Sequence, residues 1–531
     1  MNKPVFLKRN TLFLAGLFML AAGLPVSKFL TGFSQVVLLA SLLLEGSMTE
    51  KWNRLKQNKM IWLIGGIWVM HIAGLLYSED IRAGTWDARM KLPLFILTVV
   101  IGTAPPLSSA MLKKIMWTFV GAVLFGSLVS TAVLYGIIQH SVADIRDIFI
   151  FKISHIRFAL FTCLSIFYMA RQAAGSKEEI TGAGRILCVV FIGWLVIFLF
   201  LAESVTGLAI LFSLSVPALL ALGLTRKSKA TRIAVLVMAV LLPAIVALKS
   251  IAFLREINTP HDVPIRTSER TALGHEYFFI LDDHLTENGY RVWIYVNKEE
   301  MREAWNKRSA MPYDGPDKKS QPLSQTLIRY LTSLGYRKDA EAVGKLSPDD
   351  IRNIESGIAN CNYVGTSNFK ARLMELNWEY QQTLNNQSPS GHSATMRIEF
   401  WKAGMQIARE NFWTGVGTGD LQQEFNKQYE KMNSRLAAQW RLRAHNQYLS
   451  ILLAFGIFGL LYFLFALAYP ALKLKKHRDF VYLMFLGIVL LSMLTEDTLE
   501  TPAGSAFFAL FNSLFLFSET GRGESKKKRS G

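Results

Sequence analysis

Charged residues are scarce in this chain, and their scarcity argues against an ordinary soluble fold. Of the 531 residues, 18% are charged and 51% are hydrophobic. Soluble domains are about 25% charged, whereas the apolar residues here come in long blocks, as they do in helices that cross a bilayer. The composition therefore predicts a multi-pass membrane protein.

Cysteine is also scarce, which excludes a disulfide framework. The three cysteines are Cys163, Cys188 and Cys361, and two of them lie in apolar blocks. No pair is positioned for a convincing disulfide or a metal clip. The sequence has no His-Glu-x-x-His motif and no paired cysteine motif. We therefore expect neither a tightly bound metal nor a cofactor.

Nucleotide-binding motifs are missing as well. The sequence contains no P-loop and no nucleotide-binding βαβ unit, so neither ATP nor a nucleotide sugar has a recognisable cytoplasmic site. Charges within the apolar blocks are few, and this argues against an ion-coupled transporter, which usually needs buried carboxylates or histidines. A polysaccharide flippase or transporter remains the alternative from a different functional class.

Twelve apolar blocks predict an all-α membrane protein with about twelve transmembrane helices. They lie at about residues 11–24, 33–48, 60–76, 92–104, 115–139, 156–170, 186–202, 205–224, 232–250, 447–470, 480–494 and 503–518. The first block has no small-residue cleavage site, so it is expected to be retained. The predicted domains are a membrane domain at 1–250, a mainly helical extracytoplasmic loop domain at 251–446, a second membrane domain at 447–520 and a basic cytoplasmic tail at 521–531.

Lysine and arginine are distributed unevenly between the two sides of the predicted membrane. With the N-terminus inside, the inner segments carry 25 of them and the short outer segments carry seven. This bias predicts cytoplasmic termini and an external loop domain. The loop has 25 basic and 24 acidic residues, so the net charge of +18 belongs to a cytoplasmic rim that meets anionic lipid. Nucleic-acid binding is not expected.

Within the loop, helical spacing predicts helices at Glu299–Trp305, Leu323–Leu334 and Asp349–Ile358, with a helix start at Ser347. The stretch Asn385–Ser393 is rich in polar residues and glycine, and it is predicted to be a flexible joint. The basic amphipathic helix that follows is predicted to place its apolar residues on one face and Arg397 at the edge of that face. These apolar residues are Ile398, Trp401, Met405 and Ala408.

Glycines then alternate through Gly415, Gly417 and Gly419. Glycine permits backbone geometries that other residues avoid, so such a turn could expose main-chain amides to an oxyanion. No strand precedes it and no Walker lysine follows it. A plain turn is therefore the commoner interpretation.

A histidine stands at the mouth of the next apolar helix. His445 and Asn446 follow Arg441 and Arg443, and residues 448–467 are nearly all apolar. A histidine can carry a proton near neutral pH, and the arginine fork matches the geometry of phosphate. The alternative interpretation is an interfacial anchor with basic neighbours.

The other outer segments carry further polar residues near the membrane. They are Arg82, Arg89 and Lys91, then His155 and Arg157, then Glu203, and finally Glu496, Asp497 and Glu500. Each of them alone is more simply explained as interfacial capping. Together, the basic groups are predicted to ring the outer surface where the His445 helix emerges, and this ring would suit a pyrophosphate headgroup.

These features resemble the O-antigen ligase and O-antigen polymerase superfamily. The resemblance is carried by MRIEFWKAGMQIARENFWTGVGTGD and RAHNQYLSILLAFGIFGLL, and by the outer loop placed between later spans. It implies an inverting, metal-independent glycosyltransferase of the bacterial inner membrane with a periplasmic loop. The donor would be a glycan on undecaprenyl pyrophosphate. The acceptor would be lipid A-core in an O-antigen ligase, another lipid-linked repeat in a polymerase, or a Ser or Thr hydroxyl in a protein O-oligosaccharyltransferase.

The resemblance also implies roles for single residues. His445 would be the general base on the acceptor hydroxyl, and Arg397 and Arg157 would bind the donor pyrophosphate. Weaker candidates for that pyrophosphate are Arg441, Arg443, Arg89 and Lys91, and the supporting residues would be Asn446, His155, Glu203 and Glu496.

The chain departs from the family pattern at one position. Many ligases have a Ser-Arg-Thr-Gly turn, whereas the corresponding stretch here has Val205 in place of the arginine. We expect Arg157, Arg89 or Lys91 to take over the function of that arginine.

Overall fold

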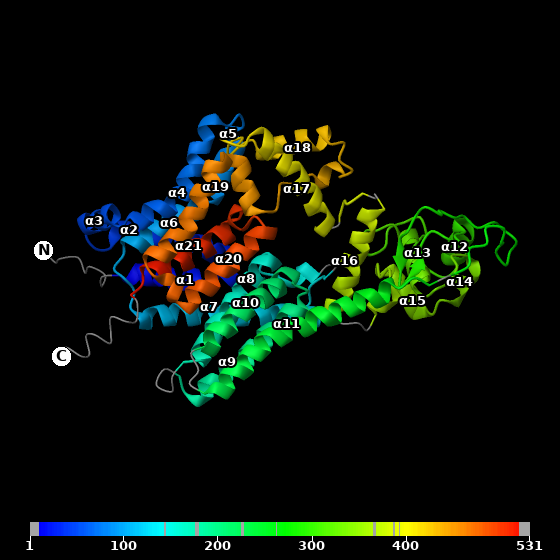
Figure 1. The fold of residues 1–531 in the computed structure, drawn as a ribbon, viewed down its shortest axis with the longest axis horizontal. Coiled ribbons are helices and arrows are strands. Elements are labelled where there is room, and N and C mark those ends of the chain that lie inside the picture. Colours follow the sequence, from blue (N-terminus) through cyan, green and yellow to red (C-terminus); the bar gives the residue numbers. More distant parts are fainter. Residues whose placement is uncertain are drawn as a thin grey trace.

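The computed structural model describes residues 10–142, 145–175, 180–224, 228–261, 263–364, 368–385, 388–391 and 393–519. Helices dominate the fold (Figure 1). The α-helices are α1 (Thr11–Val26), α2 (Lys28–Leu44), α3 (Met48–Gln57), α4 (Lys59–Ala73), α5 (Ile81–Met90), α6 (Leu92–Thr103), α7 (Ser109–Leu134), α8 (His155–Ala173), α9 (Gly182–Leu201), α10 (Val205–Leu224), α11 (Lys229–Asn258), α12 (Lys298–Asn306), α13 (Leu323–Ser333), α14 (Ala340–Lys345), α15 (Pro348–Glu355), α16 (Asn368–Leu384), α17 (Ser393–Glu410), α18 (Leu421–Lys431), α19 (Gln447–Lys473), α20 (Phe480–Thr495) and α21 (Pro502–Phe517). The 3-10 helices are η1 (Gly74–Tyr77), η2 (Ile145–Ile148), η3 (Cys361–Tyr363), η4 (Ala438–Trp440), η5 (Lys476–Arg478) and η6 (Thr498–Glu500), and the strands are β1 (Thr286–Glu287) and β2 (Tyr290–Arg291).

Each of the twelve predicted apolar blocks coincides with a helix. Among the described residues, four helices are long and apolar enough to cross a membrane, namely α4 with η1, α7, α9 and α19. A fifth candidate is the pair α2 and α3, which is bent by 107°. Shorter apolar helices are α1, the first part of α10, α20 and α21. The chain is thus an all-α membrane protein, and the number of twelve spans stays a prediction.

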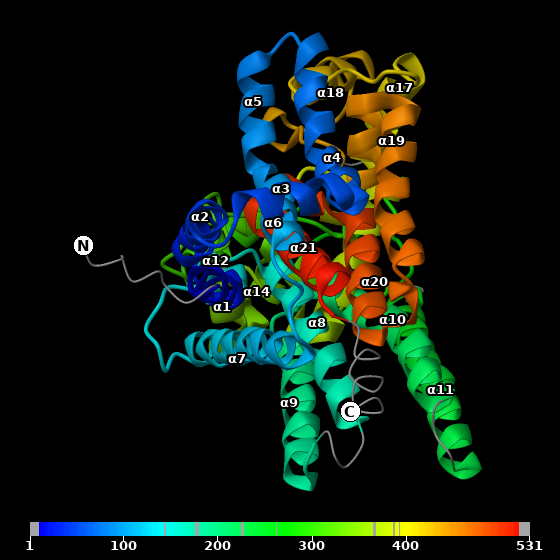
Figure 2. The same ribbon diagram turned by 90° about the vertical axis from the view of Figure 1, so that its left-hand side faces the viewer.

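Helix α21 lies in the middle of the apolar helix bundle (Figure 2). Every residue from Gly504 to Leu516 is buried, as expected for a helix that is apolar on all sides. It packs against α6 and α20, and the ring of Phe485 on α20 contacts both Phe507 and Phe511. Thr501 caps the start of α21 and Pro502 begins it. The loop that precedes α21 is therefore attached to the most rigid part of the bundle.

Helix α19 is broken inside the bundle at Gly456, where φ is 64° and ψ is −168°. The glycine turn after α17 closes the break with three main-chain hydrogen bonds. They run from Ile457 N to Phe412 O (2.8 Å), from Val416 N to Leu453 O (2.8 Å) and from Gly417 N to Ala454 O (3.0 Å). Unpaired main-chain groups cost several kcal/mol in apolar surroundings, so the turn and the broken helix form one structural unit.

The predicted apolar face of α17 is wrong in its register. Its buried residues include Met396, Phe400, Ala403 and Ile407, whereas Ile398 and Met405 are 41% and 48% exposed. Both sets follow helical spacing, so periodicity alone does not separate them. The contacts of α17 with α18 and α19 decide which set is buried. Ala408 is buried as predicted.

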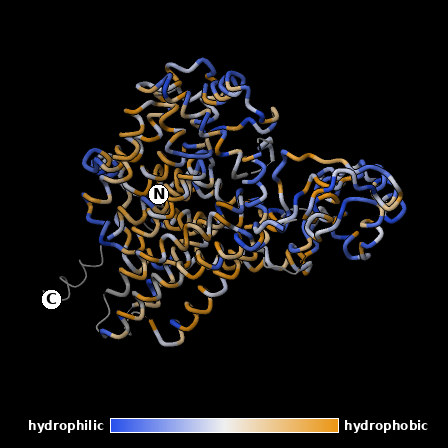
Figure 3. The backbone as a smooth tube through the Cα atoms, turned by 45° about the vertical axis from the view of Figure 1, so that its right-hand side comes forward, coloured by the Kyte–Doolittle hydropathy of each residue, from blue (hydrophilic) through white to orange (hydrophobic). Residues whose placement is uncertain are grey.

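The loop domain, which lies between α11 and α17, has a hydrophobic core of its own, built around residues such as Trp305, Leu327 and Ile354. Figures 1 and 3 show it projecting from the apolar bundle as a more polar unit at the ends of α11 and α16. The predicted helices are confirmed as α12, α13 and α15, and Ser347 begins α15 with a capping box. Residues 263–297 are largely irregular apart from β1 and β2, so this first part of the domain is not helical. The predicted joint before α17 lies partly outside the described residues.

We expect Gly415→Ala to destabilise the protein by at least about 2 kcal/mol, because a left-handed backbone and an overlapping neighbour act together. Gly415 has φ +71°, and a Cβ there would lie 2.4 Å from the backbone of Ala454. The matched control is Gly193→Ala in α9, where a Cβ meets nothing within 4 Å and the change should stay within about 1 kcal/mol. Thermal unfolding of the two purified variants would show this difference. Equal midpoints would contradict the proposed closure of the α19 break.

Lys338 makes the stability of the loop domain depend on pH. Its side chain is buried, and its Nζ donates one long hydrogen bond to Arg291 O (3.5 Å). Burial lowers the pKa of Lys338 to about 7, although Asp339 opposes the shift. Between pH 7 and 10.5 the unfolded chain therefore holds a proton that the folded domain has lost. The free energy of unfolding should rise with pH in this window, by at most about 1.4 kcal/mol per pH unit.

Lys338→Met should abolish this rise, whereas the exposed Lys318→Met should keep it. Calorimetry of the protein at pH 7, 8, 9 and 10 would follow the unfolding transition of the loop domain. A rise of the same size in Lys338→Met would assign the pH dependence to another group.

Candidate active site

Two loops meet at the start of α19. One is residues 441–446, which lead into α19, and the other is residues 496–501, which join α20 to α21. Asn446 joins the two helices beside these loops, because its side-chain oxygen accepts from Leu449 N of α19 (3.0 Å) and its Nδ2 donates to Leu494 O of α20 (2.9 Å). Asn446 therefore caps α19 and fixes the start of that helix against the end of α20.

His445 is held on one side and open on the other. It has φ +47°, which is uncommon for a residue other than glycine. Its ring stacks on Phe400 of α17 at a centroid distance of 5.6 Å. Its Nδ1 lies 4.0 Å from Glu496 Oε2, and 36% of its side chain is exposed. A group approaching from outside can thus reach the imidazole.

Glu496 collects three cationic or protonatable groups, which come from two helices and a loop. Its Oε1 accepts from Arg397 Nη2 of α17 (2.5 Å), and its Oε2 lies 4.0 Å from Arg157 Nη1 of α8 and 4.0 Å from His445. Arg397 Nε also donates to Thr495 O (3.1 Å). The glutamate is buried, so its charge acts on its neighbours with little screening from water. Residues that are far apart in the sequence form one polar cluster here.

Arg157 is buried and incompletely bonded. Its Nη2 donates to Asp497 O (3.0 Å) and its Nε donates to Thr501 Oγ1 (3.3 Å). Its Nη1 has no hydrogen-bond partner among the described residues. A buried guanidinium N–H without an acceptor is costly. This N–H therefore marks a position that an anionic oxygen would fill favourably.

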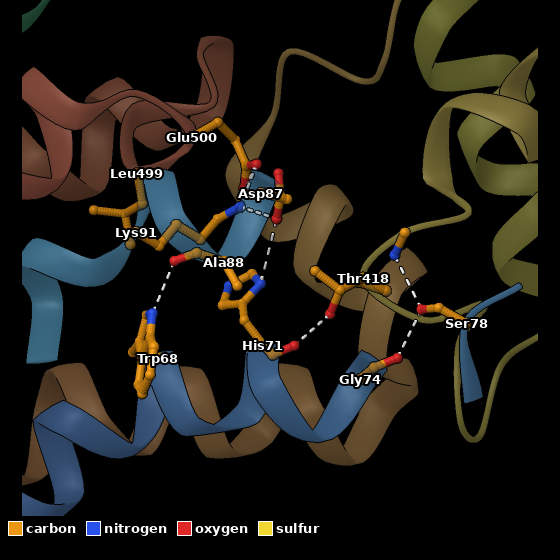
Figure 4. A network of polar contacts seen from close by, with 12 residues as sticks. Trp68, His71, Gly74, Ser78, Asp87, Ala88, Lys91, Thr418, Leu499 and Glu500 are labelled. Carbon is orange, nitrogen blue, oxygen red and sulfur yellow. Dashed lines mark hydrogen bonds and ion pairs between the residues drawn. The ribbon is translucent and has the colours of Figure 1, made fainter. Parts of the chain in front are cut away.

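A second charged network lies beside this cluster (Figure 4). Lys91 is fully buried and donates to the carboxylates of Asp87 and Glu500. Arg443 Nη1 lies 3.4 Å from Asp87 Oδ1 and 3.8 Å from Glu500 Oε2, and His71 Nδ1 lies 3.7 Å from Asp87 Oδ2. The ammonium of Lys91 is thus enclosed by protein, and this position argues against the prediction that it binds the donor pyrophosphate.

The pKa values of the two carboxylates of this network, Asp87 and Glu500, are shifted in opposite directions. Burial raises the pKa of Asp87 to about 6, and the neighbouring charge of Glu500 adds to the shift. Burial acts in the same sense on Glu500, but Lys91, His71 and Arg443 together outweigh it and hold the pKa of Glu500 well below its ordinary range. Glu500 is therefore the permanent anion that keeps Lys91 in place.

The loop 496–501 links the two groups of charges. Gln447, in the first turn of α19, donates to Glu500 Oε1 (3.1 Å) and accepts from Leu499 N (2.8 Å). Ser450, one turn further, donates to Asp497 Oδ1 (2.8 Å). The loop is therefore clamped along the start of α19, with one end at His445 and the other at Lys91.

The structure places the remaining predicted residues as follows. Arg441 Nε donates to Leu436 O and its Nη1 lies 3.8 Å from Glu430, so it belongs to the α18 side. Arg89 lies on the exposed face of α5 over the ring of Trp86. His155 begins α8, two residues before Arg157. Glu203 lies in the turn between α9 and α10, where its charge acts on Arg372 of α16.

The glycine turn does not offer its amides to a ligand. Val416, Gly417 and Gly419 all donate their N–H groups within the protein, the last to Ser78 Oγ (3.0 Å). The glycine turn therefore does not expose free amides to an oxyanion, and it is a plain turn. Among the residues that the structure describes, no group of three or more His, Cys, Asp or Glu side chains is placed to hold a metal ion.

Sequence reasoning did not assign a role to several residues of the site. Asp497 and Glu500 stand in the same short acidic stretch as Glu496, so their proximity was visible in the sequence. Gln447 and Ser450 are polar residues three positions apart at the start of an otherwise apolar helix, which is a usable signal. Phe400 carried no signal, because its stacking on His445 depends on the register of α17.

Lys91→Met should lower the free energy of unfolding by about 3–5 kcal/mol, because it leaves two buried carboxylates without their cation. Arg89→Ala is the matched control, since it removes an exposed charge from the preceding helix α5 and should be nearly neutral. Thermal unfolding in detergent would compare the two variants. A wild-type midpoint for Lys91→Met would show that the network does not stabilise the fold.

Comparison with known families agrees with this geometry. Residues 358–464 match the family model described as O-Antigen ligase. The matched segment includes all of α17, the glycine turn, α18, His445 and the first part of α19 through the break at Gly456. No curated protein matches the chain. The match over residues 358–464 confirms the resemblance of this chain to the O-antigen ligase and O-antigen polymerase superfamily.

Proposed function

We propose that this protein is an O-antigen ligase. It transfers a glycan from undecaprenyl pyrophosphate to a hydroxyl group of lipid A-core. In this proposal the protein lies in the bacterial inner membrane with both termini in the cytoplasm, and His445 faces the periplasm. The reaction inverts the anomeric centre and uses no metal.

One observation carries the proposal, namely the convergence of His445, Arg397 and Arg157 on Glu496 at the edge of the apolar bundle. His445 and Arg397 lie in the segment that matches the O-antigen ligase model. Transfer from a lipid pyrophosphate needs a base for the acceptor and cations for the leaving group. The cluster provides both within one site.

His445 is the proposed general base. Its Nδ1 faces Glu496, so Nε2 is the nitrogen that takes the proton of the acceptor hydroxyl. The acceptor oxygen forms a bond to the anomeric carbon, and the bond from that carbon to the pyrophosphate oxygen breaks. The electron pair leaves with undecaprenyl pyrophosphate. The negative charge of Glu496 stabilises the imidazolium that results.

Arg157 and Arg397 are the proposed ligands of the pyrophosphate. The buried Nη1 of Arg157 has no acceptor among the described residues, and one side of Arg397 remains partly exposed. Charge that develops on the leaving oxygen is stabilised most strongly by such preordered donors in a site with little water. Neither arginine needs to move far, because Glu496 already holds both.

His445→Ala should reduce transfer by about 10²- to 10⁴-fold, the range expected for loss of a general base. The assay uses the purified full-length protein, an undecaprenyl-pyrophosphate glycan and lipid A-core. It contains EDTA, because the proposed mechanism has no metal. The control is His284→Ala, which changes an exposed histidine of the loop domain and should transfer at the wild-type rate. Thermal unfolding would show that both variants are folded.

The acceptor supplied decides between related activities. Product on lipid A-core, lost in His445→Ala, supports the ligase. Growth of the glycan on its own lipid carrier identifies a repeat-unit polymerase, and product only on a Ser or Thr of an added protein identifies a protein O-oligosaccharyltransferase. Full activity of folded His445→Ala would remove His445 from its proposed role.

A further inference from the structure

A groove of about 630 Å³ opens along α5, outside the His445 cluster. Arg82, Trp86 and Arg89 line it from one face of α5, at spacings of four and three residues. Arg443 lines it from the loop that precedes α19. The opposite face of α5 carries Asp87, which belongs to the buried network. Two separate segments therefore build a concave surface with three guanidinium groups.

The charge of this groove is strongly positive. Arg82 and Arg89 have exposed side chains and no carboxylate within ion-pair distance among the described residues. Among the residues that the structure describes, one carboxylate lines the groove, that of Asp80, whose Oδ1 accepts from Ala83 N (2.8 Å) at the start of α5. It is therefore occupied as a helix cap. A multiply charged anion is the ligand that such a surface favours.

Arg443 is the preordered member of the three. Asp87 and Glu500 hold its guanidinium from behind, and 28% of its side chain remains exposed. Interfacial anchor residues lie singly on convex helix surfaces and snorkel to the headgroups. Here a residue from a second segment is fixed opposite the α5 arginines, as in a binding site. Trp86, which is 60% exposed, offers a ring face on which a sugar can stack.

The position of the groove relative to His445 suggests which substrate it serves. Arg443 is two residues before His445, and it contacts Glu500 at one end of the loop 496–501. The arginines proposed for the donor contact Glu496 at the other end of this loop. A transfer reaction brings two substrates to one base. Once the donor is assigned to Arg157 and Arg397, the groove is left for the acceptor.

We propose that the groove lined by Arg82, Trp86, Arg89 and Arg443 binds a phosphorylated sugar of the acceptor glycan. This inference rests on the proposed function, because it assumes that His445 transfers a glycan. In this arrangement the guanidinium groups of Arg82 and Arg89 bind the phosphate oxygens, and Arg443 fixes the end of the acceptor that is nearest to His445. The phosphate takes no part in the chemistry and serves to select and orient the acceptor.

The test compares acceptor kinetics of the wild type with those of Arg82→Ala/Arg89→Ala. The acceptors are phosphorylated lipid A-core and the same material after phosphatase treatment. The control variant, Lys402→Ala/Arg409→Ala, removes the same charge from the exposed face of α17. We expect the groove variant to raise KM for the phosphorylated acceptor by at least about 10- to 100-fold, because the loss of a single charge-assisted hydrogen bond has an effect of this size, with kcat within about twofold. The dephosphorylated acceptor and the control variant should show no such change.

A binding measurement separates failure of this inference from failure of the proposed function. The His445→Ala protein is titrated with phosphorylated and dephosphorylated core oligosaccharide in an isothermal titration calorimeter, so no turnover is needed. If the wild type transfers to no acceptor, the proposed function fails, and tighter binding of the phosphorylated oligosaccharide would still support the groove as an anion site.

Three outcomes would overturn the inference. The first is an unchanged KM of the groove variant for the phosphorylated acceptor. The second is an equal rise in KM for both acceptors, since the arginines would then not recognise phosphate. The third is that the groove variant loses a bound phosphatidylglycerol in native mass spectrometry while its acceptor KM stays at the wild-type value. That result would assign the groove to the headgroup of a bilayer lipid.

Discussion

The buried carboxylate of Glu496 holds together groups that would otherwise repel one another. Arg157 comes from α8, Arg397 from α17 and His445 from the loop before α19. Two guanidinium groups and a protonatable imidazole would separate in a poorly screened environment without an anion between them. Their arrangement depends on the position of Glu496, and that position depends on α21. The fully buried α21 and its Thr501 cap fix the loop that presents the glutamate.

The arrangement of the cluster also depends on the position of α19 relative to α17, which the glycine turn between α17 and α18 helps to fix. A break at Gly456 would leave main-chain groups unpaired inside the bundle if residues 412–417 did not supply partners. The turn also connects α17, which carries Arg397 and the Phe400 ring under His445. Closure of the break therefore sets the distance between the helix with the arginine and the helix with the histidine. The glycines of this motif shape the backbone of the turn, and the amides of Gly415, Gly417 and Gly419 are all paired within the protein.

The sequence was a good guide to the elements and to the main polar residues of the cluster, but it could not pair them. All twelve apolar blocks became helices, because hydrophobic length is a local property. Arg157 keeps an Nη1 with no hydrogen-bond partner among the described residues, whereas Lys91 is enclosed by Asp87 and Glu500. This difference depends on the contacts of Arg157 with Asp497 and of Lys91 with Glu500, which join residues more than 300 positions apart. The register of α17 failed for a related reason, since two apolar stripes fit the period and only the contacts with α18 and α19 choose between them. The expected ring of basic groups is divided into two sites by the loop 496–501, which hydropathy does not show.

The valine at position 205 fits this division of charges. Val205 begins α10, and two residues later Gly207 packs so closely on α8 that a Cβ there would lie 2.8 Å from the Cβ of Ala159. Cys163 of α8 also donates to Gly207 O. The first turns of α8 and α10 therefore lie side by side, and Arg157 is two residues before Ala159. The guanidinium of Arg157 therefore reaches the cluster from the first turn of α8, next to the first turn of α10, where an arginine at position 205 would stand. The cluster around Glu496 therefore contains a second guanidinium, that of Arg157, although the chain lacks an arginine at position 205.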